Sequence, residues 1–265
     1  MSKTILITGA TDGIGRETAQ MLVSLGHTVL LHGRNSAKLA TVAKELAAEG
    51  GRVERYVADL SQMADVAALA TAVTAKHNQL DVLINNAGVF KISNPITPDG
   101  LDVRFVVNAI APYLLTQTLM PLLEPSGRVI NVSSAAQSPV NLDALTGQVR
   151  LRQDFTAYAQ SKLALTMWSR ALALQEHRPV IIAVNPGSML GSKMVKQAFG
   201  VAGGELRIGA DILTRAALAE EFATAAGQYF DNDAGQFAPP HPDALDAQKC
   251  EGVVGAIETL LAQLT

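Results

Sequence analysis

A tyrosine and a lysine four residues apart could carry acid–base chemistry. Tyr158 and Lys162 open an amphipathic pattern that continues to Leu172, so both side chains would share one face of a helix. An ammonium group close to a phenol favours the phenolate and lowers the phenol pKa from its ordinary value of about 10. The pair could therefore donate and accept a proton, although the same spacing is common on ordinary helix surfaces.

Polar side chains in three other segments could complete such a site. Ser133 and Ser134 end an apolar run, and because successive strand side chains point to opposite faces, only one of them can reach a given site. Asn108 lies in a helical pattern of valines, where an amide group is usually exposed or a satisfied core group. The residues from Asn85 to Gly88 follow a further apolar run and have the composition of a turn.

A glycine-rich turn offers a place for phosphate groups. The residues from Thr8 to Gly15 read TGATDGIG, directly after an apolar run and directly before a helical pattern. A helix N-terminus presents unpaired N–H groups and partial positive charge, and glycines let a pyrophosphate approach the backbone closely. Three glycines at this spacing predict a nucleotide site that consists of Gly9, Thr11, Asp12, Gly13, Ile14 and Gly15.

The end of the second apolar run indicates which nucleotide binds. Sites for NAD carry an acidic residue there, which hydrogen-bonds the ribose 2′-hydroxyl, but this chain has His32, Gly33 and Arg34. A guanidinium group pairs well with a 2′-phosphate, so Arg34 favours NADP(H). The alternatives are a solvated surface arginine and, for His32, an ordinary strand-end side chain.

Short apolar runs alternate with helical patterns, which predicts an α/β fold with a parallel sheet covered on both faces. We expect strands at residues 4–8, 27–32, 52–57, 82–85, 128–133, 180–185 and 229–230. Residues 186–209 predict a long loop, 211–228 a helix and 243–264 a terminal helix. No linker divides the pattern, so we expect one domain over residues 1–265.

Composition excludes several classes of protein. The chain has 265 residues, of which 48% are hydrophobic and 17% charged, so it is not a disordered chain. Its net charge of −3 offers no basic face for nucleic acid. A single cysteine, Cys250, suits a reducing compartment, and with no leader pattern and no apolar run of about 18 residues we expect a cytoplasmic protein without a membrane partner. No metal is expected, because no ligand spacing relates the histidines at 27, 32, 77, 177 and 241.

Taken together, these motifs resemble the short-chain dehydrogenase/reductase family over nearly the whole chain. The match rests on the glycine turn, Asn85 to Gly88, Asn108, the serine pair, Tyr158 with Lys162, and Pro186-Gly187. The resemblance implies a doubly wound parallel sheet, the Rossmann fold, with seven strands ordered 3-2-1-4-5-6-7 and NADP(H) across their carboxyl ends. It also implies cofactor contacts from Asp59, Leu60, Asn86, Ala87, Gly88, Tyr158, Lys162, Pro186 and Gly187.

The resemblance implies a role for each reacting side chain. Tyr158 would give a proton to a carbonyl oxygen, while Lys162 lowers the pKa of Tyr158 and binds the nicotinamide ribose. Ser134, rather than Ser133, would polarise the carbonyl, and Asn108 would hold a water that connects Lys162 to solvent. The family is usually dimeric or tetrameric through the helices that hold Asn108 and Tyr158, so a homodimer or homotetramer is expected; the residues that could form such a face or belong to the core are Leu114, Leu115, Leu119, Trp168 and Leu172.

Within the family, the chain is similar to the retinol dehydrogenase-like and protochlorophyllide reductase-like branch. The long segment between Ser134 and Tyr158, residues 97–101 and residues 227–230 carry this likeness, which does not imply a retinoid substrate. We expect an NADP(H)-dependent oxidoreductase that acts on a carbonyl or alcohol of an apolar small molecule. The alternative is an NADP(H)-sensing binding protein without catalysis. Ser192 could contact the nicotinamide or be a loop serine, and the side chains that could line a substrate pocket or pack the loop are Met189, Leu190, Met194, Val195 and Phe199.

Overall fold

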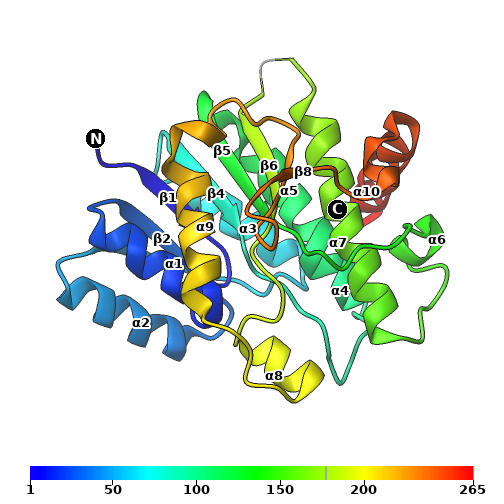
Figure 1. Cartoon of the computed structure of the whole chain (residues 1–265), viewed down its shortest axis with the longest axis horizontal. Helices are drawn as coiled ribbons and strands as arrows, with labels where there is room; N and C mark the ends of the chain where they lie inside the picture. Colours follow the sequence, from blue (N-terminus) through cyan, green and yellow to red (C-terminus); the bar gives the residue numbers. More distant parts are fainter. Residues whose placement is uncertain (177, 265) are drawn as a thin grey trace.

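The computed structural model describes residues 1–176 and 178–264, with the side chains of all of these except 124, 125 and 199. An eight-stranded sheet has the order β3-β2-β1-β4-β5-β6-β7-β8 (Figure 1). The strands are β1 Thr4–Ile7, β2 Thr28–Gly33, β3 Arg52–Val57, β4 Leu80–Asn85, β5 Leu123–Val132, β6 Val180–Asn185, β7 Tyr229–Asp231 and β8 Gln236–Ala238.

The first seven strands are parallel, in the predicted order. The sheet has eight strands rather than the seven that the resemblance implied, because β8 pairs antiparallel with β7. The turn between them contains Gly235 in the left-handed region, at φ +69°. A glycine adopts this backbone conformation without a Cβ clash, so the chain can reverse within a few residues.

Helices cover both faces of the sheet (Figure 1). Alternate residues of each central strand enter opposite cores: Leu6 joins the core under α3, α5 and α7, whereas Ile5 and Ile7 join the core under α1, α2 and α9. Because both faces are buried, the strands are apolar almost throughout, as the sequence pattern predicted. The bounds are α1 Gly13–Ser24, α2 Ser36–Ala48, α3 Met63–Thr74, α5 Ala111–Leu119, α7 Asp154–Ala173 and α9 Leu206–Leu218.

Shorter elements connect these layers. A short helix, α4, leads into the π-helix η1, and both precede α5. The remaining elements are α4 Val103–Phe105, η1 Val106–Ile110, η2 Met120–Leu122, α6 Leu142–Leu145, α8 Lys193–Phe199, η3 Glu220–Phe222, η4 Pro242–Leu245 and α10 Ala247–Leu264.

Two sequence predictions in the last third of the chain need correction. The expected loop at 186–209 contains α8, which Ser192 caps and Gly200 ends at φ +70°. The helix expected at 211–228 is α9, which begins at Leu206 and ends at Leu218. Gly209 gave the start of α9 the composition of a loop, but it lies inside the helix, where a Cβ would lie 2.8 Å from Leu190 Cδ1.

A long apolar helical run was also missed by the sequence analysis. Among the described residues, Val103–Leu122 is long and apolar enough to cross a membrane by length and composition. Polar residues such as Asn108 and Thr116 interrupt the run, so it does not read as one apolar stretch. In the fold, 72% of its apolar window is buried, as expected for a core helix.

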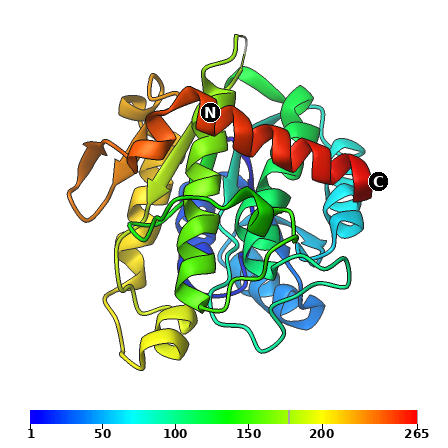
Figure 2. The same ribbon diagram turned by 90° about the vertical axis from the view of Figure 1, so that its right-hand side faces the viewer.

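The C-terminal helix α10 lies over α7, as Figure 2 shows. Its side chains Val253 and Ile257 are buried in the same core as Trp168. The sequence left open whether a set of apolar residues on α5 and α7 forms a subunit face or the core, and the structure buries four of them at 1% exposure or less: Leu115, Leu119, Trp168 and Leu172.

Candidate active site

A cavity of about 710 Å³ opens along the carboxyl ends of the central strands. This edge lies where the chain order reverses between β1 and β4, the usual ligand position in such sheets. Apart from Asn108, every residue predicted to be catalytic or to bind cofactor lines it: Gly9, Thr11, Asp12, Gly13, Ile14, Gly15, Arg34, Asp59, Leu60, Asn86, Ala87, Gly88, Ser134, Tyr158, Lys162, Pro186 and Gly187.

The glycine turn lies directly against the segment that follows β4. Gly9 has φ +69°, and a Cβ on it would lie 2.9 Å from Ala87 Cα. The hydroxyl of Thr8 accepts hydrogen bonds from the backbone N–H groups of Asn86 and Ala87, both at 3.0 Å. Asn86 returns a hydrogen bond from Nδ2 to Thr8 O at 2.8 Å. These contacts hold the turn and the segment after β4 together at the cavity wall.

The N-terminus of α1 faces the cavity at Gly13, Ile14 and Gly15, two of which carry no side chain. Asp12 caps this helix and accepts a hydrogen bond from Gly13 N at 2.8 Å. Gly13 has φ +57°, and a Cβ built on it would meet only Ser192 Cβ, 3.8 Å away. Because the N–H group of Gly13 already bonds Asp12, the N–H groups of Ile14 and Gly15 are the ones that an anion in the cavity could reach.

His32 connects three parts of the nucleotide side of the site. It is 3% exposed; its Nδ1 accepts a hydrogen bond from Gly9 N at 3.2 Å, and its Nε2 lies 3.1 Å from Ala58 O. Only the neutral ring with its proton on Nε2 satisfies both contacts. Burial lowers the pKa of His32 to about 4, so the ring is neutral near pH 7. The side chain is thus a brace for the glycine turn rather than an ordinary strand-end residue.

Two cations stand at the end of β2. Arg34 lines the cavity as predicted, and Lys38, in the first turn of α2, lines it as well. Both side chains are exposed. Nearby, the carboxylate of Asp59 accepts hydrogen bonds from Ser61 N at 2.9 Å and Ser61 Oγ at 2.8 Å, which fixes its position at the end of β3.

Tyr158, which is half-buried, and Lys162, which is 3% exposed, lie side by side on α7. The Nζ atom of Lys162 lies 5.8 Å from the centroid of the Tyr158 ring and donates a hydrogen bond to Val132 O at 2.7 Å. Burial lowers the pKa of Lys162 to about 8. Burial also raises the pKa of Tyr158 above its ordinary value, and a hydrogen bond with the Ser134 side chain opposes that rise.

The lowering of the Tyr158 pKa by Lys162 stays a prediction, because burial and the Ser134 hydrogen bond are the causes that act on this pKa in the structure. In this protein, removal of the phenol from water has the larger effect, because a buried phenolate would lose its hydration. Lys162 is itself buried, so its charged form is disfavoured as well. The neutral phenol, which can donate a proton, is the stable form of Tyr158.

The structure distinguishes the two serines. Ser133 is 3% exposed, and its hydroxyl lies 2.7 Å from Thr166 Oγ1 and donates to Lys162 O at 3.3 Å. Ser134 has a hydroxyl that accepts from Ala136 N at 3.1 Å and reaches the phenol of Tyr158. The geometry therefore favours Ser134 as the hydroxyl group nearest to the reacting position.

Asn108 is buried behind the cavity wall in η1. Its Oδ1 accepts from Val89 N at 2.8 Å, and its Nδ2 donates to Val89 O and to Ser161 Oγ, both at 2.9 Å. Both N–H groups of the amide are used in these bonds. Here Asn108 connects the segment after β4 with α7. Its role in holding a water, which the resemblance implies, stays a prediction.

One side of the cavity is apolar. The ring of Phe90 packs against the ring of Tyr158 with centroids 4.9 Å apart, and Phe155 packs against Phe90 at 6.4 Å. Met189, Leu190, Met194 and Val195 line the cavity, and Leu190 also packs the segment against Gly209 of α9; the side chain of Phe199 lies outside the described part. Ser192 also lines it, and its hydroxyl caps α8 by accepting from Val195 N at 3.2 Å.

Comparison with known proteins identifies the family. The family described as short chain dehydrogenase matches residues 3–200. The chain belongs to the short-chain dehydrogenase family. Members use nicotinamide cofactors and act on CH–OH or C=O groups, so the chain is an oxidoreductase of that type.

Three relatives of this short-chain dehydrogenase illustrate the likeness. Human retinol dehydrogenase 13 is 32% identical over 268 residues, which cover 93% of this chain and 80% of the relative. The landomycin C-6 ketoreductase LanV, crystallised with NADP and rabelomycin, is 30% identical with a TM-score of 0.68, over 87% of this chain and 94% of the other. A metagenomic short-chain oxidoreductase in complex with NADP is 35% identical with a TM-score of 0.62, over 82% and 91%.

Residues that sequence reasoning missed at the cavity of this short-chain dehydrogenase include Lys38, Phe90 and Phe155, and it did not find the contacts of His32. Lys38 could have been found from the sequence, because it lies in the first turn of the helix that Asn35 caps. No local signal marks Phe90. In the described part of the chain no group of three His, Cys, Asp or Glu side chains could hold a metal ion, and His177 lies outside that part.

Proposed function

We propose that the protein is an NADP(H)-dependent oxidoreductase that transfers a hydride between the nicotinamide and a carbonyl or alcohol carbon of an apolar small molecule. One observation carries the proposal: the glycine turn and the group Tyr158, Lys162 and Ser134 line the same cavity. A nucleotide on the turn and a carbonyl at the phenol would therefore share one enclosed space.

The residues present fit NADP(H). Gly9 and Gly13 leave the N-terminus of α1 open to a pyrophosphate, and side chains at either position would fill the cradle or strain its backbone. Arg34 and Lys38 offer two cations to a 2′-phosphate, and no acidic side chain stands at the end of β2 to bind a free ribose hydroxyl. Solved relatives that carry NADP support this assignment. When bound, the cofactor supplies or accepts the hydride.

Tyr158 donates and accepts the proton of the reaction. In the reducing direction its neutral phenol donates the proton that the carbonyl oxygen needs when the carbonyl carbon gains hydride, and Ser134 hydrogen-bonds the same oxygen. Burial, which raises the pKa of Tyr158, keeps the phenol protonated for this role. In the oxidising direction the phenolate accepts the alcohol proton, and Lys162, whose pKa is lowered to about 8, stabilises that form when it is charged.

The apolar wall selects the substrate. Phe90, Phe155 and most side chains of residues 189–195 are apolar, and Ser192 and Lys193 are the polar exceptions. A carbonyl compound with an apolar body therefore fits better than a sugar. We propose that one domain, residues 1–265, holds both sites, with residues 186–209 closing the substrate side. The buried Cys250 is consistent with work in the cytoplasm.

A turnover assay tests this function. The protein is mixed with NADPH and a panel of apolar aldehydes and ketones, and nicotinamide absorbance is followed, with NADH as the matched cofactor control. We expect oxidation of NADPH that depends on the carbonyl compound, and weaker activity with NADH. Thermal stabilisation by NADPH without turnover of any carbonyl or alcohol would instead support the non-catalytic NADP(H) sensor.

A further inference from the structure

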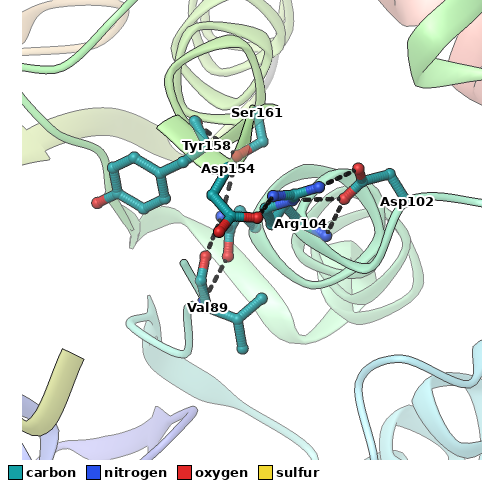
Figure 3. A network of polar contacts seen from close by, with 7 residues as sticks. Val89, Asp102, Arg104, Asp154, Tyr158 and Ser161 are labelled. Carbon is teal, nitrogen blue, oxygen red and sulfur yellow. Dashed lines mark hydrogen bonds and ion pairs between the residues drawn. The ribbon is translucent and has the colours of Figure 1, made fainter. Parts of the chain in front are cut away.

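A buried arginine connects the two helical segments that carry the reacting side chains. Arg104 lies in α4, and its side chain is 2% exposed. Its Nε and Nη2 donate to the two carboxylate oxygens of Asp102 at 2.8 and 2.6 Å. Its remaining nitrogen, Nη1, donates to Asp154 Oδ1 on α7. In Figure 3 the guanidinium group lies between the carboxylates of Asp102 and Asp154.

The positions of these residues relate them to the site. Arg104 precedes Asn108 by four residues, and Asp154 precedes Tyr158 by four residues, so each ion-pair partner lies one helical turn before a site residue. The hydrogen bond from Asn108 to Ser161 forms a second connection between the same two segments. Two polar links therefore join α4–η1 to α7, about one turn apart on the first segment and about two turns apart on α7. Tyr158 lies on α7 between them.

The geometry of the guanidinium group makes the link between Arg104 and Asp154 rigid. The planar guanidinium group binds Asp102 with two parallel N–H···O bonds, which leaves little freedom in its direction. Asp102 is also fixed, because it caps α4 by accepting from Arg104 N at 2.9 Å. The free edge of the guanidinium group therefore presents its N–H to one place on α7, which the carboxylate of Asp154 occupies.

We propose that Arg104 and Asp154 form a clamp that positions the phenol of Tyr158 in the cavity. This inference rests on the proposed function, because its main readout is turnover. Neither residue of the clamp lines the cavity, so they act through the helix and not on substrate. They are positioning residues, and Asp154 is the one whose removal is informative.

Asp154→Ala is the better variant to test. Loss of Arg104 would leave Asp102, whose side chain is 8% exposed, buried and unpaired, which destabilises folded proteins strongly. Loss of Asp154, whose side chain is 40% exposed, leaves Arg104 paired with Asp102. The matched control is Asp143→Ala, which removes another exposed first-turn aspartate, on α6, that forms no ion pair with a described residue.

Turnover and cofactor binding are measured for both variants. We expect Asp154→Ala to lower kcat by roughly tenfold to a hundredfold, because sub-ångström misplacement of an acid has such effects, with the NADPH Kd unchanged. Asp154→Glu, which restores a carboxylate, should recover most of kcat, and Asp143→Ala should behave as the unaltered protein. An unchanged kcat in Asp154→Ala, or a kcat loss matched by an equal loss of NADPH affinity, would overturn the clamp.

A second measurement does not depend on activity. If the unaltered protein reduces no carbonyl, the proposed function fails, and amide hydrogen exchange of residues 154–162 still tests the clamp. We expect this segment to exchange faster in Asp154→Ala than in Asp143→Ala. Equal exchange in the two variants would show that the ion pair does not hold this part of α7.

Discussion

His32 fixes the glycine turn from behind through its neutral ring. It accepts from Gly9 N and contacts Ala58 O, so it relates the end of β1 to the end of β3. Arg34, only two residues later, stands at the cavity and offers its charge to the nucleotide. The nucleotide side of the site thus depends on the buried, neutral His32 and on the exposed, charged Arg34.

Acid should destabilise the protein through His32. Burial lowers its pKa from the ordinary histidine value of 6.5 to about 4, so below pH 6.5 the unfolded chain binds a proton that the folded chain does not. The free energy of unfolding should thus fall as the pH drops from 6.5 towards 4, by up to roughly 3 kcal/mol from this group. Urea unfolding at pH 7 and pH 4.5 measures this loss. His32→Gln should lose less stability between these pH values, and an equal loss in both proteins would contradict the assignment.

Cofactor preference should depend on Arg34 and Lys38. Replacing either by alanine removes a charged partner of a 2′-phosphate, worth about 1.5–3 kcal/mol, so NADPH should bind roughly tenfold to a hundredfold more weakly. NADH affinity should change little, because NADH has no such phosphate. Lys44→Ala on the same helix, α2, is the control. Equal weakening of NADPH and NADH by Arg34→Ala would show that the arginine does not read the phosphate.

The substrate side is formed by an element that the sequence analysis described as a loop. Residues 191–203 carry α8 and close on themselves, with Gly191 N donating to Gly204 O at 2.7 Å and Gly204 N to Met189 O at 2.9 Å. Figure 1 shows α8 standing apart from the sheet. Gly203 has φ +75°, and a Cβ on it would lie 2.6 Å from Gly191 Cα. The backbone segments before and after α8 therefore lie in close contact at these two glycines.

Gly203→Ala should push apart the two backbone segments that meet at Gly191 and Gly203. The added Cβ meets backbone atoms that have no side-chain freedom, and the left-handed φ adds strain. We expect a higher KM for the carbonyl substrate with less effect on NADPH affinity. The control is Gly255→Ala in α10, where nothing lies within 4 Å of the added Cβ. A KM for Gly203→Ala that matches the control would contradict a role of this close contact in shaping the substrate side.

Local signals explain what the sequence could and could not predict about elements. The parallel strands and the glycine turn were predictable, because continuous apolar runs and glycine spacing are local patterns. The start of α9 was not, since Gly209 is a helix breaker by type and its reason is contact with Leu190. The links of Arg104 to Asp154 and of His32 to Gly9 join residues far apart in sequence, and only the fold brings them together.

At the scale of the whole molecule, α10 covers the side of the fold behind the site. It packs on α7 across the apolar face that contains Trp168, and Tyr113 OH donates to Glu258 Oε1 at 2.6 Å (Figure 2). The homodimer or homotetramer that the family resemblance implies stays a prediction. The same packing fixes α7 from the side opposite to the cavity, so Tyr158 is held by the core and, we propose, by the clamp.

The most direct test is the turnover of Tyr158→Phe. This change removes one oxygen atom and keeps the ring that packs on Phe90, so the fold and NADPH binding should persist. A positioned acid contributes about 10²–10⁴-fold, and we expect kcat for carbonyl reduction to fall by that much. Tyr56→Phe, at a tyrosine outside the cavity whose hydroxyl contacts Glu54, should keep full activity. A Tyr158→Phe protein that binds NADPH and reduces carbonyls at the unaltered rate would contradict the central claim that this phenol delivers the proton.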